Sequence, residues 1–301
     1  MATAPHWHPC TEEADELGES PFWHPHERAL YWVDVAGRRL RRAGAQGAQS
    51  WPMPSEPGCI APARSGGLVV ALRDGIYRAR TWGGPLERLA AAMHDPATTR
   101  FNDGRADPMG RFWAGTRHER RDQPLAGLYC YSRGEWRQMA GGALTGNGLA
   151  FSPDARTLYW ADTAAHRVDA WDWDAQANRL GARHVFQQFA PKPAGWKPGD
   201  AGYGGRPDGA AIDSEGNYWC AMYEGGRLLQ FAPDGRLLQD FAVPARCPTM
   251  PCFGGEDLRT LYLTTAREGR PGEELRALPL SGRVLCARVD VPGRPVDFVD
   301  D

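Results

Sequence analysis

The chain has 301 residues, with 35 Lys and Arg against 37 Asp and Glu and a formal net charge of −2 at pH 7. This balance lacks the basic excess that pairs with phosphates, so it argues against a nucleic-acid partner. No apolar run approaches the length of a membrane span, and the first ten residues have neither the basic nor the apolar region of a signal peptide, so we expect a cytoplasmic protein with no membrane partner.

The predicted elements begin with a hairpin that follows a lead-in segment, residues 1–17. Its first strand starts at Glu19, a turn follows at His24-Pro-His26, and the second strand begins at Tyr31. Apolar and aromatic residues on both sides of a turn are typical of paired short β-strands. A weaker copy of this unit spans residues 59–72.

The same unit recurs further along the chain, each time as a polar residue, a turn and an aromatic second strand. The polar residue and the first aromatic of the second strand are Asn102 and Phe112, Asn147 and Tyr159, and Asp208 and Tyr218. A last, weaker copy spans residues 253–264.

Six copies of one unit therefore follow one another, and their second strands begin near residues 31, 69, 112, 159, 218 and 262. A repeat of roughly 40–50 residues built from short strands is the signature of a β-propeller blade. We predict an all-β, six-bladed β-propeller that forms one domain over residues 1–301 and contains no long helix.

Two segments outside the repeats carry expectations of their own. Part of residues 1–17 or of residues 284–299 is expected to add a strand that closes the ring by pairing the first blade with the last, which removes exposed edges. Residues 187–206 are rich in Gly, Pro and aromatics and match no strand. This loop is either a lid beside the mouth that holds Asp208 or a plain insertion.

The cysteine pattern favours reduced thiols. Seven cysteines, an odd number, are scattered along the chain, which suits a cytoplasmic protein better than a disulfide framework does. Cys247 and Cys252 have a spacing found in zinc sites, but no second pair accompanies them, so buried free thiols are the favoured interpretation.

Four polar residues begin the first strands of their repeats: Glu19, Asn102, Asn147 and Asp208. The aromatic of the second strand lies 12 residues after Glu19 and Asn147 and 10 residues after Asn102 and Asp208. The two spacings differ by two residues, an even number, so the alternation of side chains along the strand is kept. We therefore predict that the four polar residues occupy equivalent positions at one mouth of the channel. Two carboxylates and two carboxamides there suit a hard divalent cation. The alternative is that each is an ordinary turn residue.

These motifs resemble the SMP-30/gluconolactonase/regucalcin family of six-bladed propeller sugar lactonases. The resemblance covers nearly the whole chain, from Leu17-Gly-Glu-Ser-Pro21 to Ala266-Arg-Glu-Gly269. Its strongest pieces are Arg100-Phe-Asn-Asp-Gly104 with Asp107-Pro108, Asn147-Gly-Leu-Ala-Phe-Ser-Pro-Asp154, Pro207-Asp-Gly209 and Cys252-Phe-Gly-Gly255.

The resemblance implies the roles of five residues. Glu19, Asn147 and Asp208 would ligate one divalent metal ion, with Ca, Mg, Mn, Zn and Fe(II) all open. Arg100 and Asn102 would contact the substrate. Asp208 would also act as the catalytic base.

The chain departs from the family at one substrate contact. Animal members carry a further substrate-contacting Glu shortly after the strand that corresponds to Ala114-Gly-Thr116. The gap-free alignment places Arg120 at that position and Glu119 one residue earlier, and adjacent strand residues face opposite sides. Glu119 is therefore carried over only as a candidate substrate contact.

The implied activity is metal-dependent hydrolysis of a sugar (aldono-)lactone, such as gluconolactone, xylonolactone or arabinolactone, to the aldonic acid. A metal ion polarises the lactone carbonyl, and a carboxylate takes the proton of the attacking water. Two alternatives stay open: the same fold and metal acting on another ester or a phosphotriester, and a non-catalytic calcium-binding propeller. The expected partner is a small-molecule sugar lactone, and the chain is expected to be a monomer or a weak homo-oligomer.

Overall fold

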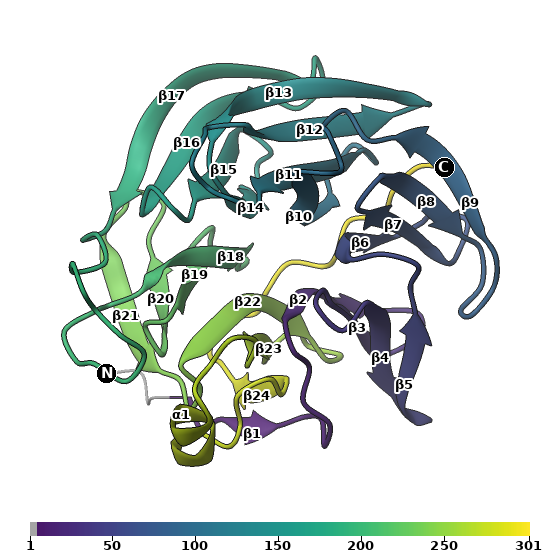
Figure 1. The fold of residues 1–301 in the computed structure, drawn as a ribbon. Helices are drawn as coiled ribbons and strands as arrows, with labels where there is room; N and C mark the ends of the chain where they lie inside the picture. The colour runs from purple at the N-terminus through teal and green to yellow at the C-terminus, as the bar shows by residue number, and fades with distance from the viewer. Residues whose placement is uncertain (1–4) are drawn as a thin grey trace.

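The computed structural model describes residues 5–301 and places their strands in six four-stranded sheets around a central channel (Figure 1). This arrangement confirms the predicted all-β, six-bladed propeller. The described residues contain one helix, α1 (Gly272–Ala277), which is short and lies between two strands of the last blade.

Each blade is an antiparallel sheet whose first strand lines the channel. The first two blades consist of β2 (Gly18–His24), β3 (Ala29–Asp34), β4 (Arg39–Gly44) and β5 (Gly47–Pro52), then β6 (Pro57–Pro62), β7 (Leu68–Leu72), β8 (Gly75–Ala79) and β9 (Leu86–Ala91). The third and fourth consist of β10 (Thr99–Ala106), β11 (Phe112–His118), β12 (Ala126–Ser132) and β13 (Glu135–Ala143), then β14 (Gly146–Phe151), β15 (Thr157–Asp162), β16 (Arg167–Asp174) and β17 (Arg179–Gln188). The last two consist of β18 (Arg206–Ile212), β19 (Tyr218–Tyr223), β20 (Arg227–Phe231) and β21 (Leu237–Ala242), then β22 (Cys247–Gly254), β23 (Thr260–Ala266), β24 (Leu285–Arg288) and β1 (His8–Pro9).

The six inner strands form a closed ring. Each of β2, β6, β10, β14, β18 and β22 contacts the next, and β22 contacts β2 again. The starts of β2, β10, β14 and β18 line one cavity, and later residues of all six inner strands line another, so the inner strands run from one mouth of the channel to the opposite one. A residue that begins an inner strand therefore reaches the same mouth in every blade.

Every inner strand carries a β-bulge near its start, where its pairing with the second strand shifts by one residue. The shifts lie between Glu19 and Phe22, Pro57 and Cys59, Phe101 and Gly104, Asn147 and Ala150, Pro207 and Ala210, and Pro248 and Pro251. A bulge bends the strand and redirects side chains. Glu19, Asn102, Asn147 and Asp208 stand at these bulges.

Buried tryptophans of the second strands are held by carboxylates in three blades. The indole Nε1 atoms of Trp32, Trp113 and Trp219 donate to Asp15, Asp107 and Asp213 at 2.7, 2.7 and 2.9 Å. A buried indole N–H needs such an acceptor. These three indole rings therefore pack inside their blades with their N–H groups paired.

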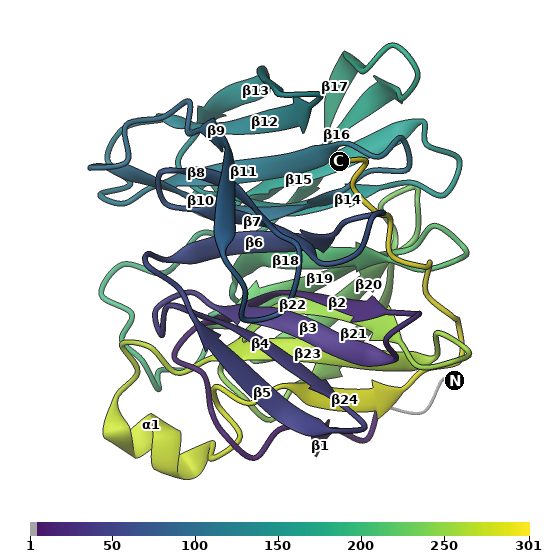
Figure 2. The same cartoon turned by 90° about the vertical axis from the view of Figure 1, so that its right-hand side faces the viewer.

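The N-terminal strand β1 closes the ring. It pairs antiparallel with β24, so the last blade contains strands from both ends of the chain, which confirms the predicted closure. The C-terminal tail then crosses to the second blade, where Val299 bridges Ala63 and Asp301 accepts a hydrogen bond from Arg78 at 2.5 Å. Figure 2 shows this tail and α1 on opposite faces of the ring.

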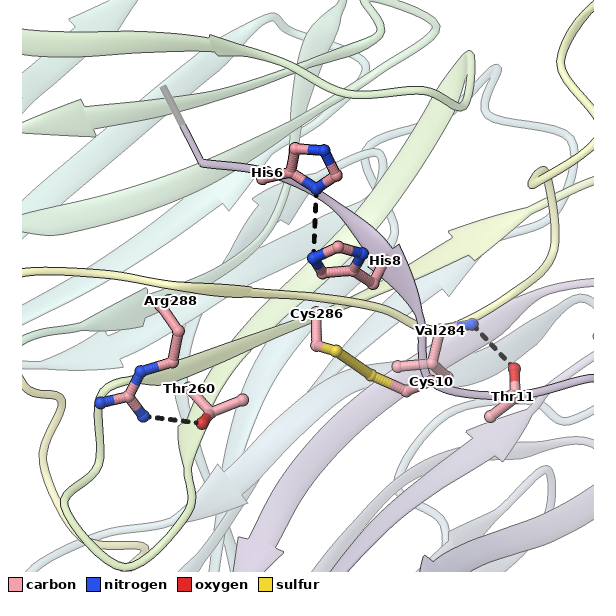
Figure 3. Close-up of a disulfide and its surroundings, with 8 residues drawn as sticks. All are labelled: His6, His8, Cys10, Thr11, Thr260, Val284, Cys286 and Arg288. Carbon is pink, nitrogen blue, oxygen red and sulfur yellow. Dashed lines mark hydrogen bonds between the residues drawn. A yellow bond between two sulfur atoms is a disulfide. The ribbon is translucent and has the colours of Figure 1, made fainter. Parts of the chain in front are cut away.

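A disulfide accompanies the closure, contrary to the expectation that all cysteines are reduced. Cys10 is joined to Cys286 next to the pairing of β1 with β24 (Figure 3). The two residues are 276 positions apart, so only ring closure brings them together. Cys247 and Cys252 are buried and free, as predicted.

None of the helical structure in the described part of the chain has the length and apolarity needed to cross a membrane.

Candidate functional site

A cavity of about 250 Å³ lies at the mouth where the inner strands begin. It is lined by five of the six residues that the sequence singles out: Glu19, Arg100, Asn102, Asn147 and Asp208. These side chains come from β2, β10, β14 and β18, four different blades. Residues 268–270, which precede α1, border the same cavity.

The four polar residues at this mouth do not share one strand register, so the prediction of equivalent positions was wrong by one residue. Glu19 and Asn147 are the last paired residues before the bulges of β2 and β14. Asn102 and Asp208 lie one position later, within the bulges of β10 and β18. Because a bulge interrupts the alternation of side chains, residues at both positions reach the same cavity.

The glycine after Asn147 is required by the local backbone. Gly148 has a φ of 57°, and a Cβ atom there would lie 2.4 Å from the hydroxyl oxygen of Tyr218. That hydroxyl donates a hydrogen bond to the carbonyl oxygen of Gly148 at 2.8 Å. The Asn-Gly pair thus allows the bulge to form against the neighbouring blade.

Glu19 and Asp208 are buried carboxylates without an ion-pair partner among residues 5–301, with exposed fractions of only 6 % and 5 %. Burial raises the pKa of Asp208 to about 8, although the charge of Arg206 opposes this shift. Burial also raises the pKa of Glu19 well above its usual value, and the nearby Asp208 carboxylate raises it further. Two such groups favour a bound cation, because an uncompensated buried charge is costly.

A chain of hydrogen bonds orients the polar groups between these carboxylates. Arg100 Nη1 donates to Asn102 Oδ1 at 2.7 Å, and Asn102 Nδ2 donates to Asn147 Oδ1 at 2.8 Å. Asn147 Nδ2 in turn donates to Thr163 Oγ1 at 2.8 Å. Both carboxamides are therefore held in one orientation, with one lone pair of Asn147 Oδ1 left for a further partner.

The donor set fits a divalent cation. Residues 5–301 contain no group of three or more His, Cys, Asp or Glu side chains arranged to hold a metal ion. The set at the mouth instead combines two carboxylates, Glu19 and Asp208, with the carboxamide oxygen of Asn147. Oxygen-only sets of this kind suit calcium, magnesium and manganese.

Glu119, the sixth predicted residue, does not line the cavity. Its carboxylate accepts a hydrogen bond from Arg73 Nη2 at 2.6 Å, and Arg73 also binds Glu56 at 2.9 Å. Arg120 does not line the cavity either. The position that does face it is Arg117, which pairs directly opposite Arg100 on the neighbouring strand.

The sequence interpretation missed several polar residues that line the cavity: Arg117, Arg121, Arg206, Tyr223, Glu224 and Arg270. Arg117 and Tyr223 stand at or near the ends of second strands. In an antiparallel hairpin the end of the second strand returns to the mouth where the inner strand starts. The repeat pattern alone could have identified these two positions.

Part of the segment 187–206 borders this mouth, because Arg206 lines the cavity. Lys192 Nζ pairs with Glu224 at 2.5 Å and lies 4.9 Å from the ring centroid of Trp196. The Tyr203 hydroxyl and His166 Nε2 share a hydrogen bond of 2.8 Å. These contacts hold the loop against the fourth and fifth blades beside the cavity.

Comparison with protein families and curated proteins gives consistent matches. Residues 17–267 match the family model described as SMP-30/Gluconolactonase/LRE-like region. The chain is 45 % identical over 280 residues to the 6-deoxy-6-sulfogluconolactonase of Pseudomonas putida, with 92 % of each chain covered. It is 33 % identical to the pentonolactonase XacC of Haloferax volcanii, with 93 % of each chain covered.

Solved structures match the fold as well. The structure of regucalcin, a calcium-binding protein from Agrobacterium tumefaciens, superposes with a TM-score of 0.88 at 25 % identity and covers 99 % of this chain and 97 % of that one. A gluconolactonase from Xanthomonas campestris superposes with a TM-score of 0.73 at 21 % identity, covering 96 % and 90 % of the two chains.

Proposed function

Because this chain belongs to the SMP-30/gluconolactonase/LRE-like family, we propose that it is a sugar lactonase that hydrolyses an aldonolactone to the aldonic acid. The observation that carries the proposal is the pair of buried, unpaired carboxylates, Glu19 and Asp208, which share one cavity with Arg100 and Asn102. Two relatives that match more than nine-tenths of the chain are named as a 6-deoxy-6-sulfogluconolactonase and a pentonolactonase.

Three residues would hold one divalent cation: Glu19, Asn147 and Asp208. When bound, such a cation supplies Lewis-acid polarisation of an ester carbonyl oxygen. The two buried carboxylates, which lack any other cationic partner in the described chain, support this assignment.

Asp208 would act as the general base. Its carboxylate takes a proton from water while the water oxygen bonds to the carbonyl carbon of the lactone. The bond between that carbon and the ring oxygen then breaks, and the same proton passes to the ring oxygen, which leaves as a hydroxyl group. Asp208 lines the same cavity as Arg100 and Asn102, so one carboxylate can serve both proton transfers.

Arg100 and Asn102 would orient the substrate. Arg100 is fixed by its hydrogen bonds to the Phe101 carbonyl oxygen at 2.8 Å and to Asn102 at 2.7 Å. A held guanidinium can donate to ring hydroxyls or to the oxyanion that forms at the carbonyl. We do not include Glu119 among the contacts, because its ion pair with Arg73 would first have to open.

The test is lactone turnover by protein freed of metal and then supplied singly with Ca, Mg, Mn, Zn or Fe(II). The panel contains gluconolactone, xylonolactone, arabinolactone and, because of the Pseudomonas putida relative, 6-deoxy-6-sulfogluconolactone. An aryl ester and a phosphotriester test the other-ester alternative, and calcium binding without turnover would support the non-catalytic one. A Glu19→Gln variant purified in the same way controls for contaminating lactonase. Absence of turnover on every lactone with every cation would overturn the proposal.

A further inference from the structure

One side of the cavity is lined by three arginines that have no assigned role. Arg117 lies near the end of β11, Arg121 follows in the next loop, and Arg206 is the first residue of β18. The carboxylates of Glu19 and Asp208 come from the starts of β2 and β18. The mouth therefore combines an acidic set with a cluster of guanidinium groups, which we call the arginine cluster (Arg117, Arg121 and Arg206).

The arginine cluster is poorly neutralised by the protein. Arg117 and Arg121 form no ion pair within residues 5–301. Arg206 pairs with Glu224 at 3.3 Å, but Glu224 is shared with Lys192 at 2.5 Å and Arg270 at 3.1 Å. One carboxylate thus serves three cations, and the other two members of the arginine cluster have no ion-pair partner in the described residues.

The arrangement places like charges against one another. Arg117 stands directly opposite Arg100 in the pairing of β10 with β11, where like charges destabilise a sheet. Burial lowers the pKa of Arg100 to about 10, and the charge of Arg117 lowers it further. Burial likewise lowers the pKa of Arg121, and the positive charges of Arg117 and Arg206 lower it further. An anion bound among these groups would relieve this repulsion.

Unused donors point to the same conclusion. The buried Nε atoms of Arg117 and Arg206 have no hydrogen-bond partner within the described residues. Buried polar groups are rarely left unpaired without a functional reason. Guanidinium forks match the oxygen geometry of sulfonate and phosphate groups and bind them with charge-assisted hydrogen bonds.

We propose that the arginine cluster is a subsite for a tetrahedral oxyanion carried by the substrate, so that the preferred lactone bears a sulfonate or a phosphate group outside its ring. This inference rests on the proposed lactonase function and specifies its substrate class. Arg117, Arg121 and Arg206 act as specificity-determining residues, and the anchored anion fixes the orientation of the lactone ring relative to Asp208.

The first experiment compares kcat/KM for 6-deoxy-6-sulfogluconolactone, 6-phosphogluconolactone and neutral gluconolactone. The wild-type protein should favour at least one anionic lactone by at least about tenfold, in line with a charge-assisted contact. Comparison of kcat/KM for the sulfonated and the phosphorylated lactone shows which of the two groups the subsite binds. High salt should reduce this preference, because the arginines are partly exposed.

Variants identify the residues responsible. Arg121→Gln should lower the ratio of anionic to neutral kcat/KM at least about tenfold, mainly through KM, and Arg121→Lys should restore part of it. Arg121 is the most exposed member of the arginine cluster, so this variant is expected to fold. Arg120→Gln is the matched control, since Arg120 is an exposed neighbour that does not line the cavity, and it should leave the ratio unchanged.

A binding measurement separates the two proposals. Calorimetry with 6-phosphogluconate and 6-deoxy-6-sulfogluconate against gluconate should show tighter binding of an anionic product, and the Arg121→Gln variant should lose this difference. If no lactone is hydrolysed but this difference is found, the lactonase proposal fails and the subsite stands. If lactones are hydrolysed without preference for an anionic one, or with a preference that Arg121→Gln and Arg117→Gln both keep, the subsite is overturned.

Discussion

Asn102 Nδ2 donates a hydrogen bond to Asn147 Oδ1 at 2.8 Å and so connects the proposed substrate contact to the proposed metal ligand. The two residues come from adjacent blades, on β10 and β14, and Arg100 extends the connection at 2.7 Å. Loss of one member should therefore affect substrate orientation and metal binding to different degrees.

Asn102→Ala should lower kcat/KM for the preferred lactone by about ten- to a hundredfold, because it removes an orienting group in contact with substrate. The metal content of the purified variant should stay close to that of the wild-type protein, since all three proposed ligands remain. Lactone kinetics and elemental analysis on the same sample check both points. A variant that has lost its metal would show that Asn102 supports Asn147 more than it serves the substrate.

Asp208→Asn should reduce the rate of lactone opening at least about a hundredfold, because the variant keeps an oxygen that can reach the metal but loses a positioned base. Asp240→Asn, a change at an exposed position of β21, serves as the chemical control and should leave turnover unaltered. Bound metal and kcat are measured on both variants. If Asp208→Asn keeps its metal and near-full activity, Asp208 is not the base.

Removal of divalent cations should both abolish turnover and lower the melting temperature. Without a cation, Glu19 and Asp208 repel each other in a buried cavity, and a ligand that binds only the folded chain stabilises it. Thermal melting with a chelator, and again after each cation is restored, measures the effect. In Glu19→Gln the difference in melting temperature between the cation-free and the cation-supplied protein should be smaller than in the wild type. An equally large difference would show that the cation binds elsewhere.

The buried Asp15 should make part of the stability depend on pH. Burial raises its pKa to about 6, against an ordinary value of 3.8, although Arg41 opposes the shift. The folded state therefore binds the proton of Asp15 more tightly than the unfolded chain does. The stabilisation that results is complete below about pH 4 and is lost as pH rises through about 6.

Urea unfolding at pH 4 and pH 7 tests this expectation. The free energy of unfolding of wild-type protein should fall relative to Asp15→Asn by about 2–3 kcal/mol between these pH values. The comparison uses the change in the free energy of unfolding with pH rather than its value at one pH, because the substitution also changes the hydrogen bond from Trp32. Parallel pH profiles of the two proteins would contradict the assigned shift.

The Cys10–Cys286 disulfide should stabilise ring closure. It links strands that close the propeller across 276 residues, so reduction or Cys10→Ser should cost about 2–4 kcal/mol of unfolding free energy. Non-reducing mass spectrometry should detect one disulfide and five free thiols, and a reductant should lower the melting temperature of wild-type protein but not of Cys10→Ser. Seven titratable thiols in the untreated folded protein would refute the assignment.

The architecture and the carboxylate and carboxamide residues of the mouth could be predicted from the sequence alone. Aromatic second strands recur at a blade-like spacing, and this local pattern specifies six similar sheets. Glu19, Asn102, Asn147 and Asp208 could be placed at one mouth because each begins an inner strand, and all inner strands of a propeller run from the same mouth. Repetition and strand alternation are local properties, so they can be seen in the sequence.

Only the tertiary structure decided the register, the additional charges and the disulfide. Asn102 and Asp208 lie one residue later in the bulges of their strands than Glu19 does in its own. The even residue spacing in the sequence cannot reveal this shift, because a bulge breaks the alternation of side chains along a strand. Arg121 and Arg206 face one cavity from different blades, and Cys10 meets Cys286 only when the ring closes. Each of these contacts joins segments far apart in the chain, and no local pattern of residues specifies how such segments meet.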